Sequence, residues 1–164
     1  MDKAFMNEIL EVLAKDARIT PATIAVMLRK PESEIAAAIA WLEEQRIIVK
    51  YATMVNPDTI TDEKVSAMIE VRVSPQREQG FDAIAERIYR FDEVDTVLLM
   101  SGGFDLMVMV EGKTMREVAM FVAQHLSTLE NVLSTATHFV LKHYKLDGVI
   151  IEEREQDERL AVHP

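Results

Sequence analysis

The stretch that decides the fold is Val94–Glu111, V-D-T-V-L-L-M-S-G-G-F-D-L-M-V-M-V-E. Its first run, Val94–Met100, is almost continuously apolar, which is typical of a buried strand. Its second run, Phe104–Glu111, has apolar residues at alternate positions, which predicts a strand with one buried face. Ser101–Gly103 separates the two runs. Because glycine adopts positive φ without steric cost, a glycine pair between β-rich runs predicts a hairpin.

Asp105 follows this turn, where its carboxylate can meet exposed backbone N–H groups. Two interpretations remain open at this point. The first is a tight hairpin with a solvated aspartate, and the second is a loop that binds a small ligand on a rigid sheet. Spacing alone does not separate them.

The neighbouring segments extend the hairpin into a larger sheet. Lys64–Val73 alternates and predicts a half-buried strand, and Val132–Tyr144 predicts the last strand. Between these strands, Phe81–Phe91 and Met115–Leu129 carry helical apolar stripes, the second opened by a capping box. The order strand, helix, strand, strand, helix, strand predicts a ferredoxin-like βαββαβ domain with both helices on one face.

The N-terminal part reads as three helices followed by a short strand. The expected helices are Asp2–Lys15, a second from Thr20 to Leu28, and Glu32–Gln45, and the expected strand is Arg46–Tyr51. This pattern predicts a winged helix-turn-helix domain whose third helix enters a major groove. A small helical domain used for packing or protein contact is equally compatible. The fold class is therefore α+β, with the helical domain first.

Composition sets the domain boundaries. A winged helix-turn-helix domain (1–55), a polar linker (56–63), a ferredoxin-like domain (64–145) and an acidic tail (146–164) are expected. The tail predicts either a strand at Val149–Ile151 followed by an amphipathic helix, or a frayed acidic end.

One face of the expected sheet would carry no helix. It would hold an apolar set, namely Met68, Met107, Met109, Ala136, His138 and Val140. Monomeric proteins rarely expose such a patch, so we expect a second copy of the chain to cover it with two-fold symmetry. The alternative is that the N-terminal domain or the tail covers this face.

The chain has 164 residues, a formal net charge of −10 and no cysteine, which excludes disulfides and thiolate metal sites. Residues 1–52 carry 7 Lys+Arg and 8 Asp+Glu, whereas the remainder carries 11 and 20. This balance disfavours a general polyanion binder. The first residues show no signal-peptide pattern, and no apolar run has membrane-spanning length, so we expect a cytoplasmic protein without a membrane partner.

No pattern of catalytic or cofactor-binding residues is evident. The histidines have no metal-ligand spacing with a partner, and Ser101 has no identifiable base. P-loop, nucleophile-elbow and zincin motifs are absent. We therefore expect no enzyme activity, no metal and no cofactor. The four histidines are His125, His138, His143 and His163.

Four groups of residues occur in a fairly specific order and spacing: Asp16-Ala17-Arg18, Leu42-Glu43-Glu44 ahead of Ile47-Ile48, Tyr51 with Asn56-Pro57, and Gly103-Phe104-Asp105. Together with the segments of residues 1–142, they resemble the Lrp/AsnC, or feast/famine, family of regulators. It implies a DNA-binding domain and an effector domain, and dimers formed through the sheet that often assemble into octamers. It also implies an amino acid or similar metabolite held between dimers. The effector residues it implies are Ser101, Gly102, Gly103, Phe104, Asp105, Thr135 and Thr137.

The expected recognition helix departs from the family pattern. It holds no Lys or Arg from Pro31 to Gln45, and its positions before Leu42 include Ala37, Ala38, Ala40 and Trp41. Arg46 replaces a glycine that the family often has before the wing. Because Arg and Lys are the usual groups for reading guanine and neutralising phosphate, we predict weak and strongly salt-dependent DNA binding, or a domain repurposed for partner contact. The remaining candidate DNA contacts are Arg29, Lys30, Ser33, Arg46 and Lys50.

Two functions other than a DNA-binding regulator are alternatives for this chain. Haem-pathway decarboxylases share the two-domain architecture and would use histidines and arginines around a tetrapyrrole, but this chain lacks the His-Asn-Tyr-like stretch expected of them. The second is a metabolite-sensing module that binds no DNA. The interpretation adopted is a DNA-binding regulator that assembles through its C-terminal sheet and senses a small metabolite with the Ser101–Asp105 loop.

Overall fold

The computed structural model describes residues 2–59, 64–74 and 80–151. The chain forms two compact units, residues 1–55 and 56–164, and each is described by itself.

The N-terminal unit contains three helices, α1 (Lys3–Lys15), α2 (Pro21–Leu28) and α3 (Glu32–Glu44). The Asp2 carboxylate accepts the Ala4 N–H and begins α1, and the Thr20 hydroxyl accepts the Thr23 N–H and begins α2. Apolar side chains from all three helices meet in one core. Its fully buried members are Ile9, Ile24, Ile35, Ala38 and Leu42.

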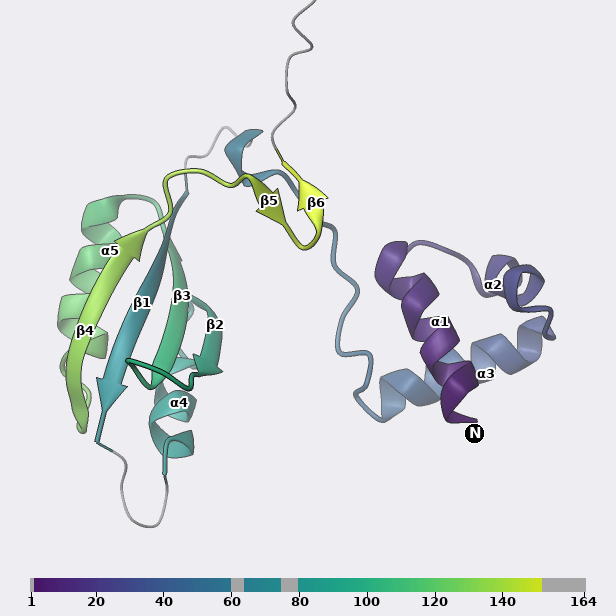
Figure 1. Cartoon of the computed structure of the whole chain (residues 1–164), viewed down its shortest axis with the longest axis horizontal. Helices are drawn as coiled ribbons and strands as arrows, with labels where there is room; N and C mark the ends of the chain where they lie inside the picture. The colour runs from purple at the N-terminus through teal and green to yellow at the C-terminus, as the bar shows by residue number, and fades with distance from the viewer. Residues whose placement is uncertain (1, 60–63, 75–79, 152–164) are drawn as a thin grey trace, which may run out of the picture. The chain divides into compact units, whose positions relative to one another are not determined.

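The strand expected at Arg46–Tyr51 is not formed. The N–H groups of Ile47 and Ile48 bond back to the Leu42 carbonyl at the end of α3, and the chain then runs on as neither helix nor strand (Figure 1). A strand requires a neighbouring strand to pair with its backbone, and the described part of this unit offers none. The β-rich composition of this segment is therefore not realised as a sheet in the single chain.

The C-terminal unit has the expected ferredoxin-like arrangement. Its strands are β1 (Val65–Val73), β2 (Val94–Leu99), β3 (Leu106–Gly112) and β4 (Val132–Phe139), in the antiparallel order β2-β3-β1-β4. Its helices are the short η1 (Pro57–Thr59), α4 (Asp82–Ile88), α5 (Met115–Phe121) and the π-helical continuation η2 (Val122–Leu126). The predicted fold class is confirmed.

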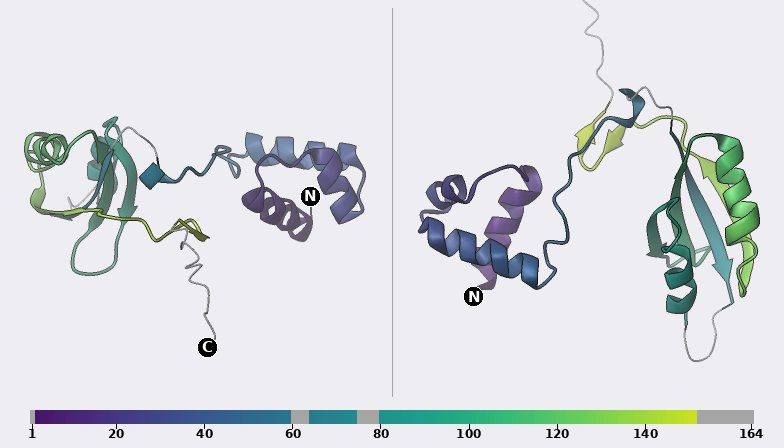
Figure 2. Two further views of the ribbon diagram at one scale, coloured as in Figure 1. Left: turned by 90° about the horizontal axis from the view of Figure 1, so that it is seen from above. Right: turned by 180° about the vertical axis from the view of Figure 1, so that it is seen from behind.

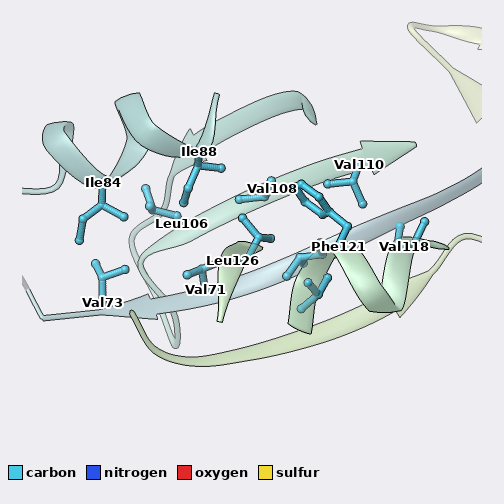
Figure 3. Close-up of a cluster of buried hydrophobic side chains, with 13 residues drawn as sticks. Val71, Val73, Ile84, Ile88, Leu106, Val108, Val110, Val118, Phe121 and Leu126 are labelled. Atoms are coloured by element: carbon cyan, nitrogen blue, oxygen red, sulfur yellow. The ribbon is translucent and has the colours of Figure 1, made fainter. Parts of the chain in front are cut away.

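Both helices cover the same face of the sheet, as the two opposite views show (Figures 1 and 2). Alternate residues of β1 and β3 point toward these helices, because side chains alternate along a strand. Figure 3 shows Ile84 and Ile88 of α4 and Phe121 of α5 packed against this layer. The buried strand residues of this core are Ala67, Ile69, Val71, Val73, Leu106, Val108 and Val110.

Some boundaries differ from expectation. The helix expected to run to Leu129 changes to π-helical geometry at Val122 and ends at Leu126. The last strand ends at Phe139, and a small hairpin of β5 (Lys145–Leu146) and β6 (Val149–Ile150) follows. Asp147 and Gly148 join these short strands with positive φ at both positions, as in type I′ turns. The acidic segment after residue 151, with its expected helix, lies outside the described residues.

Candidate functional site

Asp105 is fixed to two strands by three hydrogen bonds. Its N–H donates to the Val71 carbonyl at 3.1 Å, and its own carbonyl accepts the Met100 N–H at 2.8 Å. Its carboxylate Oδ2 accepts the Val73 N–H at 2.9 Å. Because the β1–β3 ladder ends at the pair of Val71 and Leu106, this carboxylate satisfies a backbone donor that no β3 carbonyl reaches. The sequence predicted a carboxylate beside backbone N–H groups, and this contact shows which group it meets.

The chain between Met100 and Asp105 forms an open loop. Ser101, Gly102 and Gly103 are exposed, and no described backbone group bonds to the N–H groups of Ser101–Phe104. The predicted hairpin of β2 and β3 is formed, although neither glycine of the pair adopts positive φ. A Cβ built on either glycine meets no atom within 4 Å. The described residues therefore place no steric demand for glycine at these positions.

The two threonines expected in the effector site lie on the side of the sheet that the helices cover. Thr135 pairs with Val71 and Thr137 pairs with Ile69, and both β1 residues are core residues. The Thr135 hydroxyl lies 3.2 Å from the Ser127 hydroxyl, just after η2. Thr135 shares a cross-strand row with Val71 and Leu106, so it lies at the same end of the sheet as the loop. Both threonine side chains are half-buried.

The loop can hold both charges of a zwitterion. Exposed backbone N–H groups bind carboxylates, as nests of main-chain donors do in many anion sites. The Asp105 carboxylate contacts Val73 through one oxygen, which leaves the other to meet an ammonium group. The sheet fixes the loop at both ends, so these groups are already positioned before a ligand arrives.

The two arginines proposed as DNA contacts end the helices of the helix-turn-helix. Arg29 follows α2 with φ 54° and Arg46 follows α3 with φ 55°, both in the left-handed region. At Arg46 the turn is a Schellman motif, since its N–H bonds to the Glu43 carbonyl and the Ile47 N–H bonds to the Leu42 carbonyl. Glycine adopts this conformation without strain, so a glycine would also fit at this position.

The other candidate DNA contacts differ in whether their side chains already have a partner. Lys30 already pairs with Glu34 at 3.5 Å, and its ammonium lies 5.3 Å from the centre of the Phe5 ring. Ser33 and Lys50 are exposed, on α3 and after it. Arg29, Arg46 and Lys50 make no ion pair with any residue that the structure describes, so their charges are available to a partner.

The exposed surface of α3 is small, apolar and acidic. Ala36, Ala37 and Ala40 are exposed along it, and Trp41 is partly exposed. Glu43 accepts the Tyr51 phenol at 2.9 Å and so ties the chain after α3 to the helix. Partial burial of the phenol, reinforced by the nearby Glu43 carboxylate, raises the pKa of Tyr51.

The face of the sheet opposite the helices carries the expected methionines. Met68 pairs directly with Met109 on β3, and Met107 pairs with Glu70. The sequence pattern did not predict a polar contact within this face: His138 Nε2 lies 3.2 Å from Glu70 Oε1. The register explains this pair, because His138 opposes Met68 and Glu70 opposes Ala136, one step along the same face.

The described ranges hold no cluster of three or more histidine, cysteine or acidic side chains able to bind a metal ion. No helix within those ranges combines the length and apolar character needed to cross a membrane.

Sequence comparison identifies relatives over almost the whole chain. The profile of the Lrp/AsnC ligand binding domain matches residues 66–150. The uncharacterized HTH-type transcriptional regulator YugG of Bacillus subtilis is 47% identical over 159 residues, covering 96% of each chain. An uncharacterized HTH-type transcriptional regulator of Pyrococcus furiosus is 32% identical, covering 80% of this chain and 86% of the relative.

Solved structures show the same fold at low sequence identity. The crystal structure of PH0061 matches with a TM-score of 0.75 at 17% identity, covering 92% of this chain and 98% of that one. Escherichia coli AsnC matches with a TM-score of 0.69 at 18% identity, covering 89% and 96%. Neisseria meningitidis NMB0573, solved in complex with L-Met, matches with a TM-score of 0.70 at 23% identity, covering 89% and 93%. The profile match and the relatives together establish that this chain belongs to the Lrp/AsnC family of transcriptional regulators.

Proposed function

We propose that this regulator binds DNA through its N-terminal unit, self-associates through its sheet and senses an amino acid with the Ser101–Asp105 loop. The observation that carries the sensing step is the loop itself: two exposed glycines beside open space, N–H groups that no described backbone group accepts, and a carboxylate fixed by Val73. The L-Met complex of the Neisseria neighbour supports an amino acid as the ligand class.

Self-association would cover the face of the sheet opposite α4 and α5. Met68, Met107 and Met109 form an apolar centre there, and Lys64 pairs with Glu111 at 2.8 Å beside them. Methionine side chains adapt to a facing surface, which suits an interface between identical chains. A two-fold axis through this centre would cover the face on both copies at once.

The coupling between ligand and DNA follows from this assembly. A ligand bound where glycine backbone meets a neighbouring copy would change how the copies pack. The spacing of paired DNA-binding units would then change, because half-site spacing is set by the geometry of the assembly. The two glycines have room for that close approach.

DNA recognition would depend on few charges. Arg29, Arg46 and Lys50 would contact phosphates, and α3 would read bases through Ser33 and its exposed alanines. Alanine contacts the thymine methyl group and not the guanine edge, so a preference for A·T-rich half-sites follows. Few phosphate contacts per unit imply modest affinity, and each contact, repeated in every unit of the assembly, steepens the fall of that affinity with salt.

A mobility-shift titration on the DNA upstream of its own coding sequence tests this function. Low salt should give a shift that an active amino acid alters, and about 0.2 M salt should weaken it strongly. No shift at micromolar protein would refute the DNA-binding part.

A second candidate is a metabolite-sensing module that no longer binds DNA. The acidic and alanine-rich surface of α3 favours it. Amino-acid binding seen by thermal shift, with no shift of any upstream DNA fragment, would select this candidate.

A further inference from the structure

A histidine–carboxylate contact lies on the face of the sheet opposite α4 and α5. His138 Nε2 and Glu70 Oε1 are 3.2 Å apart, with the side chains 52% and 31% exposed. Met68 lies opposite His138, and Met107 lies opposite Glu70. A titratable pair is therefore set among the apolar residues that a second copy would cover.

We propose that His138 and Glu70 make self-association through this face pH-dependent, with tighter assembly when His138 is protonated. The inference rests on the proposed function, because it requires this face to be the interface. Imidazole is the side chain that ordinarily changes charge between about pH 5 and 8, which sets the pH interval for the test.

Covering the face removes water from Glu70, whose side chain is already more buried than that of His138. Burying a lone carboxylate is costly, whereas a carboxylate paired with a cation at hydrogen-bond distance loses less on dehydration. Protonated His138 supplies that cation. Neutral imidazole supplies a hydrogen bond but no charge, so the interface is weaker when His138 is unprotonated.

The other charged groups near this face do not replace His138. On β1, Arg72 lies two residues along the same face from Glu70, and its side chain is exposed. From β3, Glu111 faces Lys64, which is bonded to it at 2.8 Å, and Asp95 at the start of β2 also interacts with Lys64. None of these residue types ordinarily changes charge between about pH 6 and 8.

The test is sedimentation velocity of the full chain at about pH 6 and about pH 8, at a constant ionic strength of about 0.15 M. The wild-type dissociation constant for self-association should be about tenfold lower at the acid pH than at the alkaline pH. His138→Gln keeps a polar side chain without titration, and its dissociation constant should be the same at both pH values. Glu70→Gln should likewise remove most of the difference.

Two variants serve as controls. His125→Gln removes an exposed histidine whose ring lies tilted against Phe91 and Phe121 on the helix side, and it should retain the wild-type pH difference. The exchange Glu70→His with His138→Glu rebuilds the pair in reverse and should restore the difference. Far-ultraviolet circular dichroism and the melting temperature confirm that each variant is folded.

The outcomes are distinguishable. A wild-type assembly with equal affinity at both pH values, or a pH difference that persists in His138→Gln, overturns this inference and leaves the proposed function intact. A chain that stays monomeric at both pH values overturns the proposed self-association together with the inference.

Discussion

The Asp105 carboxylate accepts the Val73 N–H at 2.9 Å and joins the end of the hairpin loop to the end of β1. This contact gives Asp105 a structural role in addition to the ligand contact proposed for it. Removing the side chain would therefore disturb the sheet and the binding loop together. Any mutational test of ligand binding at this position has to separate the two effects.

Asp105→Ala should lower the free energy of unfolding by about 1–3 kcal/mol, because it leaves the partly buried Val73 N–H without an acceptor. Asp105→Asn keeps a side-chain oxygen at the same position and should cost less than about 1 kcal/mol. Urea unfolding measures both values. If the asparagine variant proved as costly as the alanine variant, charge and not hydrogen bonding would hold the loop.

Gly103→Ala should leave the stability of the chain unchanged or raise it by up to about 1 kcal/mol, because φ is not left-handed and the added Cβ meets no atom. Gly112→Ala is the matched control. Its Cβ would lie 2.9 Å from Val118 Cγ2, so it should destabilise by about 1–3 kcal/mol. The melting temperature should therefore stay the same or rise for Gly103→Ala and should fall for Gly112→Ala, relative to wild type. Equal destabilisation would contradict the open loop.

Arg46→Gly should preserve folding, because glycine relieves the left-handed backbone while it adds freedom to the unfolded chain. The variant therefore isolates the loss of charge. If Arg46 contacts a phosphate, the slope of log affinity against log salt should fall by about 0.9. Fluorescence anisotropy with upstream DNA at several salt concentrations measures this slope. An unchanged slope would exclude Arg46 from the DNA contact.

Tyr51→Phe should cost about 0.5–1 kcal/mol at neutral pH, since it removes the exposed hydrogen bond to Glu43. The pKa of Tyr51 is raised in the folded chain, first by burial of the phenol and then by Glu43. The wild-type contribution is therefore fully present below the tyrosine pKa of the unfolded chain, about 10, and is lost as pH rises through the raised native value. The difference in unfolding free energy between wild type and Tyr51→Phe should therefore shrink as pH rises between these two pKa values.

Urea unfolding at neutral and alkaline pH checks this dependence. Tyr89→Phe, which removes an exposed phenol on the other unit, serves as the control and should leave the N-terminal unit unaffected. If the loss of unfolding free energy in Tyr51→Phe stayed constant into the alkaline range, the predicted pH dependence would be contradicted.

Local patterns in the sequence sufficed for most of the fold. The cap at Thr20 and the capping box at Thr114 begin α2 and α5 as expected, since both depend on nearby residues. The prediction of a strand at Arg46–Tyr51 was wrong, because a strand forms only where a second strand pairs with it, and local sequence does not show whether such a strand is present. The prediction of a continuous α-helix beyond Val122 was also wrong, because an amphipathic stripe does not distinguish an α-helix from a π-helix.

The candidate site was predictable only in part. Glycines and an aspartate between two strands located the loop, but the partner of Asp105 depends on where β1 ends relative to β3. Thr135 and Thr137 were placed by family resemblance, and strand register puts them on the helix-covered side. The same register creates the contact between His138 and Glu70, which are too far apart along the chain for a local pattern to reveal it.

The Ser101–Asp105 loop is the proposed binding site for an amino acid. Isothermal titration calorimetry of the common amino acids against wild type and Gly103→Ala tests it most directly, because the substitution adds only a methyl group toward open space. At least one amino acid should bind wild type and should bind the variant at least about tenfold more weakly, a loss of about 1.4 kcal/mol. Equal affinity in both proteins, or no binding to wild type, would contradict it.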